Sequence, residues 1–203
     1  AECNLKHLTH LLSENSNQKF DRNKAIEIRE LAKKSIGLNS NSVSLELKQT
    51  ISIIQFLQQQ IDDIEKRIKE ILKEIDTPIL SIPGISFKLA GSILAEIGDI
   101  SRFDSPAKLL AFAGLDPSMY QSGKFFSTHS VMVKRGSKYL RFALMNAARM
   151  VCLNDATFNE FKAKKMAEGK HYMVTMGHVA KKLVRVIYYL LKTNTKYQAD
   201  KVA

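Results

Sequence analysis

The most regular feature of the chain is a heptad pattern of apolar residues in its first half. From residue 45 onward the apolar positions recur at alternating spacings of three and four, the a/d register of a coiled coil. These positions are Leu47, Thr50, Ile54, Leu57, Ile61, Ile64, Ile68, Ile71 and Ile75. Such a stripe predicts one long helix that packs against another helix.

Two partners fit this stripe: the same segment of a second subunit, or the preceding helix folded back as a hairpin. Isoleucine at most a and several d positions does not select a number of strands. Charged side chains such as Asp62, Glu65 and Arg67 flank the stripe. We therefore predict that residues 45–75 are an assembly arm that forms a homo-oligomer, with the intramolecular hairpin as the alternative.

The rest of the pattern predicts shorter helices. Lys24 to Ile36 reads as an amphipathic helix stopped by Gly37, followed by a polar linker at 39–42. All four prolines fall between positions 78 and 117, so turns are frequent there. Two short helices are expected in that region: one from Ser86 as cap to Gly98, and one from Ser105 as cap to Gly114.

After residue 117 a serine-rich loop runs to Gly136, with room for a short hairpin around Phe125 to Val133. Two core helices follow, because apolar residues recur at helical spacing and no alternation is long enough for a sheet. Their core positions are Leu140, Leu144, Ala147 and Val151, then Met176, Ala180, Leu183, Ile187, Leu190 and Leu191.

Charge separates the chain into two parts. Residues 1–76 hold 12 basic and 12 acidic side chains, whereas residues 77–203 hold 19 basic and 8 acidic ones, so the net charge of +11 belongs to the second part. Between Pro117 and Asn154 there are six basic residues and no acidic one. This bias favours contact with a polyanion over a merely solvated basic face.

Other features restrict the class of protein. No stretch approaches the roughly 20 apolar residues of a membrane span, and no charged-then-apolar leader is present, so we expect a cytoplasmic protein with no membrane partner. Cys3 and Cys152 lie far apart and are expected to be free thiols. No methionine precedes Met119, which suggests a piece of a longer protein.

The segment Ile82-Pro83-Gly84-Ile85 resembles the hairpin of a helix-hairpin-helix DNA-binding motif. A tight turn with glycine lets backbone N–H groups approach a phosphate, and the dipole of the helix that follows adds positive potential. The expected nucleic-acid contacts here are Pro83, Gly84, Ile85, Ser86 and Lys88. A plain turn between two packed helices is the alternative.

A second cluster combines a serine with basic residues. Ser122 precedes Gly123 on the loop, and the basic residues Lys124, Lys134, Arg135, Lys138 and Arg141 follow. This order could place a hydroxyl beside a bound phosphodiester. Taken alone it is weak, because serines beside glycine are usually turn residues.

These pieces together, in this order, resemble the C-terminal transposase domain of the IS110 family of insertion-sequence transposases, which includes the Piv-type DNA invertases. The resemblance covers about residues 77–195, and the heptads resemble the coiled coil that joins the two domains of such enzymes. The matching residues are 82–85, 95–99, Phe103, Ser105, Leu109, Ala111, Ala113, Gly114, Leu115, Pro117, Ser122-Gly123, 134–136 and 139–141.

The resemblance implies a recombinase guided by a structured bridge RNA and acting on DNA. In such an enzyme an N-terminal RuvC-like domain supplies four acidic residues that bind Mg²⁺, and the C-terminal domain supplies a serine. By residue match that serine is Ser122, which would attack a DNA phosphodiester to give a phosphoserine intermediate. The acidic residues of this chain show no metal-ligand pattern, so we expect no metal in this fragment and no activity from it alone.

The chain departs from the family pattern beside the serine, where a glycine pair is expected and Gly123-Lys124 stands. Ser127 and Ser130 are therefore secondary candidates for the nucleophile, with His129 a weak candidate base. His171 and His178 are expected to be surface or capping residues.

The sequence thus predicts a mainly α protein. A helical coiled-coil and dimerisation region covers residues 1–76, and a helical domain with a helix-hairpin-helix-like motif and room for a short β-hairpin covers 77–203. The leading functional hypothesis is the DNA-binding, serine-nucleophile domain of a transposase. Two alternatives are a non-catalytic helix-hairpin-helix adaptor, which does not need Ser122, and a purely structural coiled-coil protein, which leaves the basic charge of 77–203 unexplained.

Overall fold

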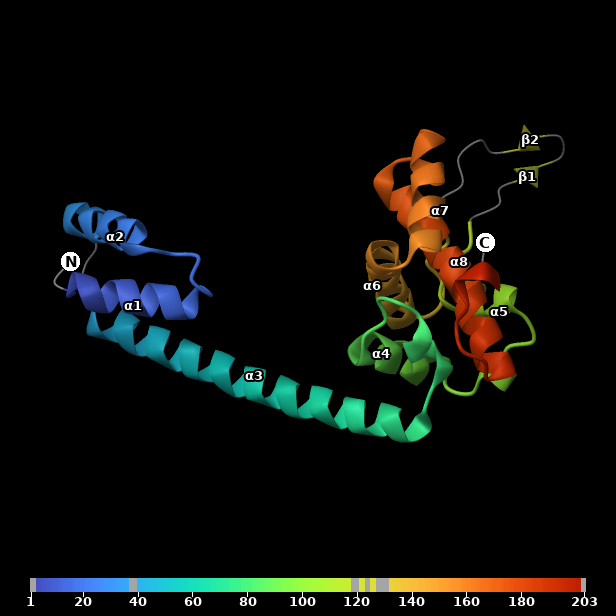
Figure 1. Cartoon of the computed structure of the whole chain (residues 1–203), viewed down its shortest axis with the longest axis horizontal. Helices are drawn as coiled ribbons and strands as arrows, with labels where there is room; N and C mark the ends of the chain where they lie inside the picture. The colour runs from blue at the N-terminus through green and yellow to red at the C-terminus, as the bar shows by residue number, and fades with distance from the viewer. Residues whose placement is uncertain (1–2, 37–39, 118–120, 123–124, 127–131, 202–203) are drawn as a thin grey trace. The chain divides into compact units, whose positions relative to one another are not determined.

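The computed structural model describes residues 3–36, 40–117, 121–122, 125–126 and 132–201 of the chain. They form the mainly α protein expected from the sequence (Figure 1). The chain divides into two compact units, Ala1–Phe56 and Leu57–Ala203, with the division inside the long helix. The predicted boundary at 76/77 is where the charge composition changes. The division between the two compact units lies about twenty residues earlier, between Phe56 and Leu57.

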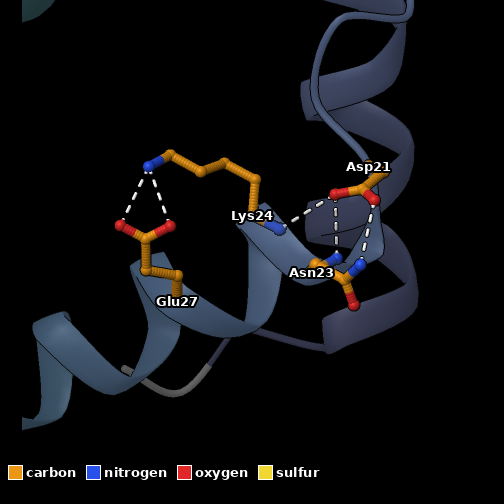
Figure 2. Close-up of polar contacts among 4 residues, drawn as sticks. All are labelled: Asp21, Asn23, Lys24 and Glu27. Atoms are coloured by element: carbon orange, nitrogen blue, oxygen red, sulfur yellow. Dashed lines mark hydrogen bonds and ion pairs between the residues drawn. The ribbon is translucent and has the colours of Figure 1, made fainter.

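The first unit contains α1 (Leu5–Asn15), α2 (Arg22–Lys34) and the start of α3 (Asn41–Ile75). Asp21 caps α2 by accepting hydrogen bonds from the backbone N–H groups of Asn23 and Lys24 at 3.0 and 3.1 Å (Figure 2). Helix α2 ends at Lys34, two residues before the predicted end, and Asn41 and Ser42 belong to α3 rather than to a linker.

Helix α3 covers the whole predicted heptad segment and leaves most of its apolar stripe in solvent. Ile54, Leu57 and Ile64 are each more than half exposed. The stripe changes role near its end, where Leu72 is buried in the core of the second unit and Ile68 packs against that core. A Cβ at Gly91 of α4 would lie 2.8 Å from Cγ2 of Ile68.

The second unit is a helical bundle around one apolar core. Its elements are the 3₁₀ turns η1 (Pro78–Ser81), η2 (Ile100–Arg102) and η3 (Ala199–Lys201), the helices α4 (Phe87–Ile97), α5 (Pro106–Phe112), α6 (Lys138–Asn154), α7 (Ala156–Ala167) and α8 (Tyr172–Thr193), and the strands β1 (Gln121–Ser122) and β2 (Phe125–Phe126). Helix α8 lies among α5, α6 and α7 and supplies a large share of the buried side chains (Figure 1).

The predicted caps of the short helices are confirmed. The hydroxyl of Ser86 accepts from the Leu89 N–H, and that of Ser105 from the Lys108 N–H. Gly98 ends α4 with a φ of +60°, in the left-handed region that favours glycine. The predicted core positions of α6 and α8 are buried as well, except Leu191, which is partly buried against the core.

Two short strands pair antiparallel, with Gln121 opposite Phe126 and Ser122 opposite Phe125. Of the hairpin predicted around Phe125 to Val133, residues 127–131 lie outside the described part of the chain. No helix of the described residues is long and apolar enough to cross a membrane.

Candidate nucleic-acid interface around the serine hairpin

The strand pair with Ser122 stands between two chain segments, 114–117 and 132–136, that run antiparallel against α5, and we call these described parts together the ribbon. Near the base, Pro117 pairs with Met132. The Val133 N–H donates to the Asp116 carbonyl at 2.9 Å, and the Lys134 N–H to the Gly114 carbonyl at 3.1 Å. Backbone hydrogen bonds therefore hold the base, while Ser122 lies in the strand pair beyond it.

Two glycines let the arms of the ribbon cross tightly over the end of α5. A Cβ at Gly136 would lie 2.1 Å from the carbonyl oxygen of Phe112, and a Cβ at Gly114 would lie 2.2 Å from that of Arg135. Both glycines have positive φ, +97° and +65°. No other residue type fits either position, so the Lys134-Arg135-Gly136 element of the sequence has a structural reason for its glycine.

Lys134 and Arg135 lie exposed at this crossing, and Lys134 adopts the left-handed backbone conformation with a φ of +58°. A non-glycine residue there costs of order 1 kcal/mol. The left-handed conformation of Lys134 turns the chain just before α6. At the start of α6, the ammonium of Lys138 lies 5.0 Å from the centroid of the exposed Tyr139 ring. Phe142, 72% exposed, is one turn further along α6. Three cations and two open rings thus surround the N-terminus of α6.

Arg141 was expected to contact nucleic acid, and the structure gives its guanidinium an internal role. Its Nη1 donates to the carbonyls of Ala113 and Lys134, at 3.3 and 3.1 Å. These two acceptors lie on opposite arms of the ribbon base. Arg141 therefore joins the arms to α6, a positioning role that the sequence did not reveal.

Glu96 is a second positioning residue that the sequence did not single out. The hydroxyl of Ser137, the N-cap of α6, donates to Oε2 of Glu96 at 2.5 Å and accepts from the Leu140 N–H at 3.0 Å. This places the end of α4 against the start of α6. In the sequence, Glu96 was visible only as part of the 95–99 segment that resembles the family, just before Gly98 at the end of a predicted helix.

The helix-hairpin-helix-like turn lies at the other end of α4. Ser86 caps its first turn and Glu96 lies in its last, so the two groups of predicted contacts are separated by about 15 Å of helix. Pro83, Ser86 and Lys88 are exposed, and Ile85 is buried. The element before the turn is the four-residue η1 rather than a full helix.

The glycine of this turn has a packing reason. With a φ of +92°, Gly84 lies against α6 so closely that a Cβ would meet the carbonyl oxygen of Met150 at 2.6 Å. The ammonium of Lys88 forms an ion pair with Glu65 of α3. The backbone N–H groups of Phe87 and Lys88 have no hydrogen-bond partner among the described residues, so the first turn of α4 can still receive an anion.

Several predicted residues lie outside the described part of the chain: Lys124, Ser127, His129 and Ser130. Within the part that is described, no group of three or more histidine, cysteine or carboxylate side chains could hold a metal ion. Of the two histidines expected to be surface or capping residues, His171 caps α8 by accepting from the Met173 N–H. Cys3 and Cys152 are free, as predicted.

Comparison with known proteins agrees with this arrangement. Residues 76–164 match the family described as the Transposase IS116/IS110/IS902 family. This segment contains the turn at Gly84, the ribbon and all of α6.

Curated relatives carry related names. The chain is 31% identical over 120 residues to the pilin gene-inverting protein of Moraxella bovis, which covers 59% of this chain and 37% of that protein. It is 29% identical over 151 residues to the transposase for insertion sequence element IS1328 of Yersinia enterocolitica, a match that covers 70% of this chain and 44% of that protein. An uncharacterized 43.6 kDa protein of insertion element IS110 from Streptomyces coelicolor is 27% identical over 125 residues, covering 61% and 30%. The chain thus spans less than half the length of these relatives.

Proposed function

Because residues 76–164 match the IS116/IS110/IS902 transposase family, we propose that this chain is the DNA-joining domain of a transposase or recombinase that cuts and rejoins DNA through Ser122. The observation that carries this proposal is the ribbon. It starts and ends on a fixed helical base, and Ser122 lies in its outer strand pair, close in sequence to the cations around the N-terminus of α6.

The chemistry divides between the tip and the base of the ribbon. The Ser122 oxygen attacks the phosphorus of a DNA phosphodiester, the bond from that phosphorus to the oxygen of the leaving strand breaks, and the serine proton ends on that oxygen as the strand's free hydroxyl. The hydroxyl of another DNA strand then attacks the phosphoserine and releases the serine. Lys134, Arg135 and Lys138 offer positive charge to the phosphates, which a phosphoryl-transfer transition state needs.

Binding and chemistry are separated in this proposal. The open N–H groups at the start of α4, with Pro83, Gly84 and Ser86, bind backbone phosphates and carry no sequence information, which fits a protein whose target is chosen by a guide RNA. Mg²⁺, which the family resemblance implies, does not fit the carboxylates of the described residues. It would be held by acidic residues of the longer enzyme, and no step is assigned to it here.

The exposed stripe of α3 supports assembly as a homo-oligomer. Ile54, Leu57, Ile61 and Ile64 are between 45% and 59% exposed at a/d positions, and leaving such side chains in water is unfavourable by roughly 1–2 kcal/mol each. A parallel or antiparallel pairing of two copies would cover them.

The test of the catalytic proposal uses this chain joined to the Mg²⁺-binding domain of the longer enzyme, with guide RNA and end-labelled target DNA. The measured quantity is a covalent protein–DNA adduct in the wild type, Ser122→Ala, Ser127→Ala and Ser130→Ala. Loss of the adduct in Ser122→Ala alone supports the proposal. An adduct that persists in Ser122→Ala but is lost in one of the other two transfers the role to that serine.

A third outcome separates the proposal from the adaptor alternative. If no variant and no wild-type sample forms an adduct, while all bind DNA with equal affinity, the chain is a non-catalytic DNA-binding module. Strand cleavage by the purified 203-residue chain with Mg²⁺ would contradict the division of labour between this chain and the metal-binding domain.

A further inference from the structure

A cleft of about 1080 Å³ lies along α8, away from the residues of the proposed reaction. Its walls are α8, the side chain of Phe161 on α7, and the segment 195–198 that follows α8. Except for Phe161, its lining lies beyond the residues that match the transposase family. The volume slightly exceeds the upper end of the range for small-molecule sites, about 300–1,000 Å³.

The cleft is strongly basic. Lys181, Lys182, Arg185 and Lys196 line it together with His178, and no carboxylate is among the described lining residues. None of these four cations forms an ion pair with another described residue. Four cations that converge without a counter-charge repel each other, and an anion that enters the cleft removes that repulsion.

The nearby carboxylates are already engaged. Asp155 accepts hydrogen bonds from the Tyr197 hydroxyl at 3.0 Å and from the Phe158 N–H at 2.9 Å. Glu168 is paired with Lys165 and Lys170, at 2.7 and 2.8 Å. Asp155 offsets part of the positive charge at Lys182, and Glu168 does so at His178. Among the described residues no carboxylate forms an ion pair with Lys181, Arg185 or Lys196, so the charge of these three cations remains open to a ligand.

Aromatic rings lie between the cations. Phe161, Tyr189 and Tyr197 line the cleft, and Tyr189 is 53% exposed. The ammonium of Lys182 lies over the Phe161 ring at 5.0 Å from its centroid, and burial lowers its pKa. Cations alone suit any phosphate, but cations interleaved with rings suit a ligand that offers both phosphates and flat bases.

The cleft residues on α8 lie in a line along the helix and are not clustered at one place. His178, Lys181, Lys182, Arg185 and Tyr189 occur at helical spacings of three, four, seven and eleven, so they share one face over about 16 Å. The opposite wall is fixed because Tyr197 is anchored twice, by its hydroxyl on Asp155 and by its N–H on the hydroxyl of Ser81 at 2.8 Å. A fixed cleft of this length fits a strand of several nucleotides.

We propose that this cleft binds a single-stranded segment of nucleic acid, with its phosphates on Lys181, Arg185 and Lys196 and a base stacked on the exposed ring of Tyr189. A duplex keeps its bases stacked on each other and cannot offer one to this ring. The site is separate from the ribbon, so the proposal does not depend on Ser122 being a nucleophile.

The experiment measures fluorescence anisotropy of the 203-residue chain with labelled 12-nucleotide oligo(dT), oligo(U) and a 12-base-pair duplex, over a series of salt concentrations. The cleft variants are Lys181→Gln/Arg185→Gln and Tyr189→Ala. The matched controls on α8 are Lys192→Gln and Tyr172→Ala, both exposed and absent from the cleft lining. The ribbon variant Lys134→Gln/Arg135→Gln completes the set, and thermal melting checks that each variant folds.

We expect the double cleft variant to bind single strands at least tenfold more weakly and to reduce the slope of log Kd against log salt by about 1.4, or 0.7 per lost phosphate contact. Tyr189→Ala should weaken binding by roughly 5- to 150-fold with an unchanged slope, because it removes base stacking. The two α8 controls should bind as the wild type does. Tighter binding of oligo(dT) or of oligo(U) identifies the strand as DNA or RNA.

The ribbon variant separates this site from the proposed function. It should weaken duplex binding and leave single-strand binding unchanged, while the cleft variants do the reverse. Single-strand affinity that is equal in wild type, the double cleft variant and Tyr189→Ala would overturn the inference. So would cleft variants that weaken duplex and single-strand binding to the same extent.

Discussion

Ser137 and Glu96, 41 residues apart, are joined by a 2.5 Å hydrogen bond in which the serine hydroxyl donates to the carboxylate. The same hydroxyl accepts from the N–H of Leu140 and so caps α6. One side chain thus begins a helix and connects it to α4. Because Ser137 follows the ribbon directly, this link also determines where the ribbon returns to the core.

Replacing this serine should therefore cost more than replacing an ordinary cap. We expect Ser137→Ala to lower the free energy of unfolding by about 2–3 kcal/mol, since it removes both a cap and a hydrogen bond to a charged group. Ser105→Ala, which removes only the cap of α5, should cost about 1 kcal/mol. Urea unfolding of both variants measures the difference, and equal losses would mean that the link to Glu96 contributes nothing.

The crossing at Gly136 should tolerate no side chain. Gly136→Ala combines a positive φ with a Cβ 2.1 Å from the Phe112 carbonyl oxygen, and we expect a loss of about 3 kcal/mol or more. Gly169 has a similar φ of +77° but open space around it, so Gly169→Ala should lose only about 1 kcal/mol. Chemical denaturation gives the free energy of unfolding of both variants, and the difference between them is the cost of the clash with Phe112. Equal losses of stability in the two variants would show that the ribbon base moves to accommodate the new methyl group.

Sequence patterns predicted the regular parts of this fold. Helix α4 was recognisable from its cap Ser86 and its terminating Gly98, and α3 from its heptads, because these signals are local. Helix α7 was missed because its apolar residues do not gather on one face at helical spacing, and of its described side chains Phe158 alone is buried. Ile68 stands at a heptad position but packs against the core of its own chain, not against a coiled-coil partner. This contact depends on the missing side chain of Gly91 in α4, and the heptad pattern does not reveal it.

The candidate site was only partly predictable for a similar reason. The glycines and basic residues stand out in the sequence, but the acceptors of Arg141 are backbone carbonyls, which every residue has. The basic cleft was missed because Lys181, Lys182 and Arg185 are interleaved with core positions of α8 and gain their meaning only from the segment 195–198 packed beside them.

The anchoring of the C-terminal segment can be tested at Tyr197. Burial and the hydrogen bond to Asp155 raise the pKa of this phenol, so it stays a donor throughout the neutral range. Tyr197→Phe leaves the buried Asp155 with one donor fewer and should cost about 1–3 kcal/mol. Tyr172→Phe, at an exposed position, serves as the control in thermal unfolding and should be close to wild type. Equal stability of the two variants would remove Tyr197 as an anchor.

Assembly through α3 should depend on its stripe. We expect Ile54→Asp/Ile61→Asp to reduce the mass measured by analytical ultracentrifugation from that of an oligomer to that of a single chain, because two charges would be buried at a and a′ positions. Gln55→Glu/Gln59→Glu adds the same charge away from the stripe and should leave the mass unchanged. A wild-type chain that sediments as a monomer contradicts the assembly proposal directly.

Binding in the cleft should tighten as the pH falls from about 7.5 to about 6. Burial first, then Lys181, Lys170 and Lys165, lower the pKa of His178 below its ordinary 6.5, with Glu168 opposing. A phosphate in the cleft favours the imidazolium and raises this pKa, so binding takes up a proton and strengthens at lower pH. His178→Gln should abolish the pH dependence of oligo(dT) affinity; an unchanged dependence would assign it to another group.

The attachment of the ribbon has a consequence for how this kind of domain can change. Its base is held by main-chain hydrogen bonds and two glycines, all contributed by residues up to Asp116 and from Val133 onward. The scaffold thus carries its own means of closing the ribbon. We therefore expect the sequence carried on this base to be exchangeable between relatives, so that residues 118–131 of one could be grafted onto the scaffold of another.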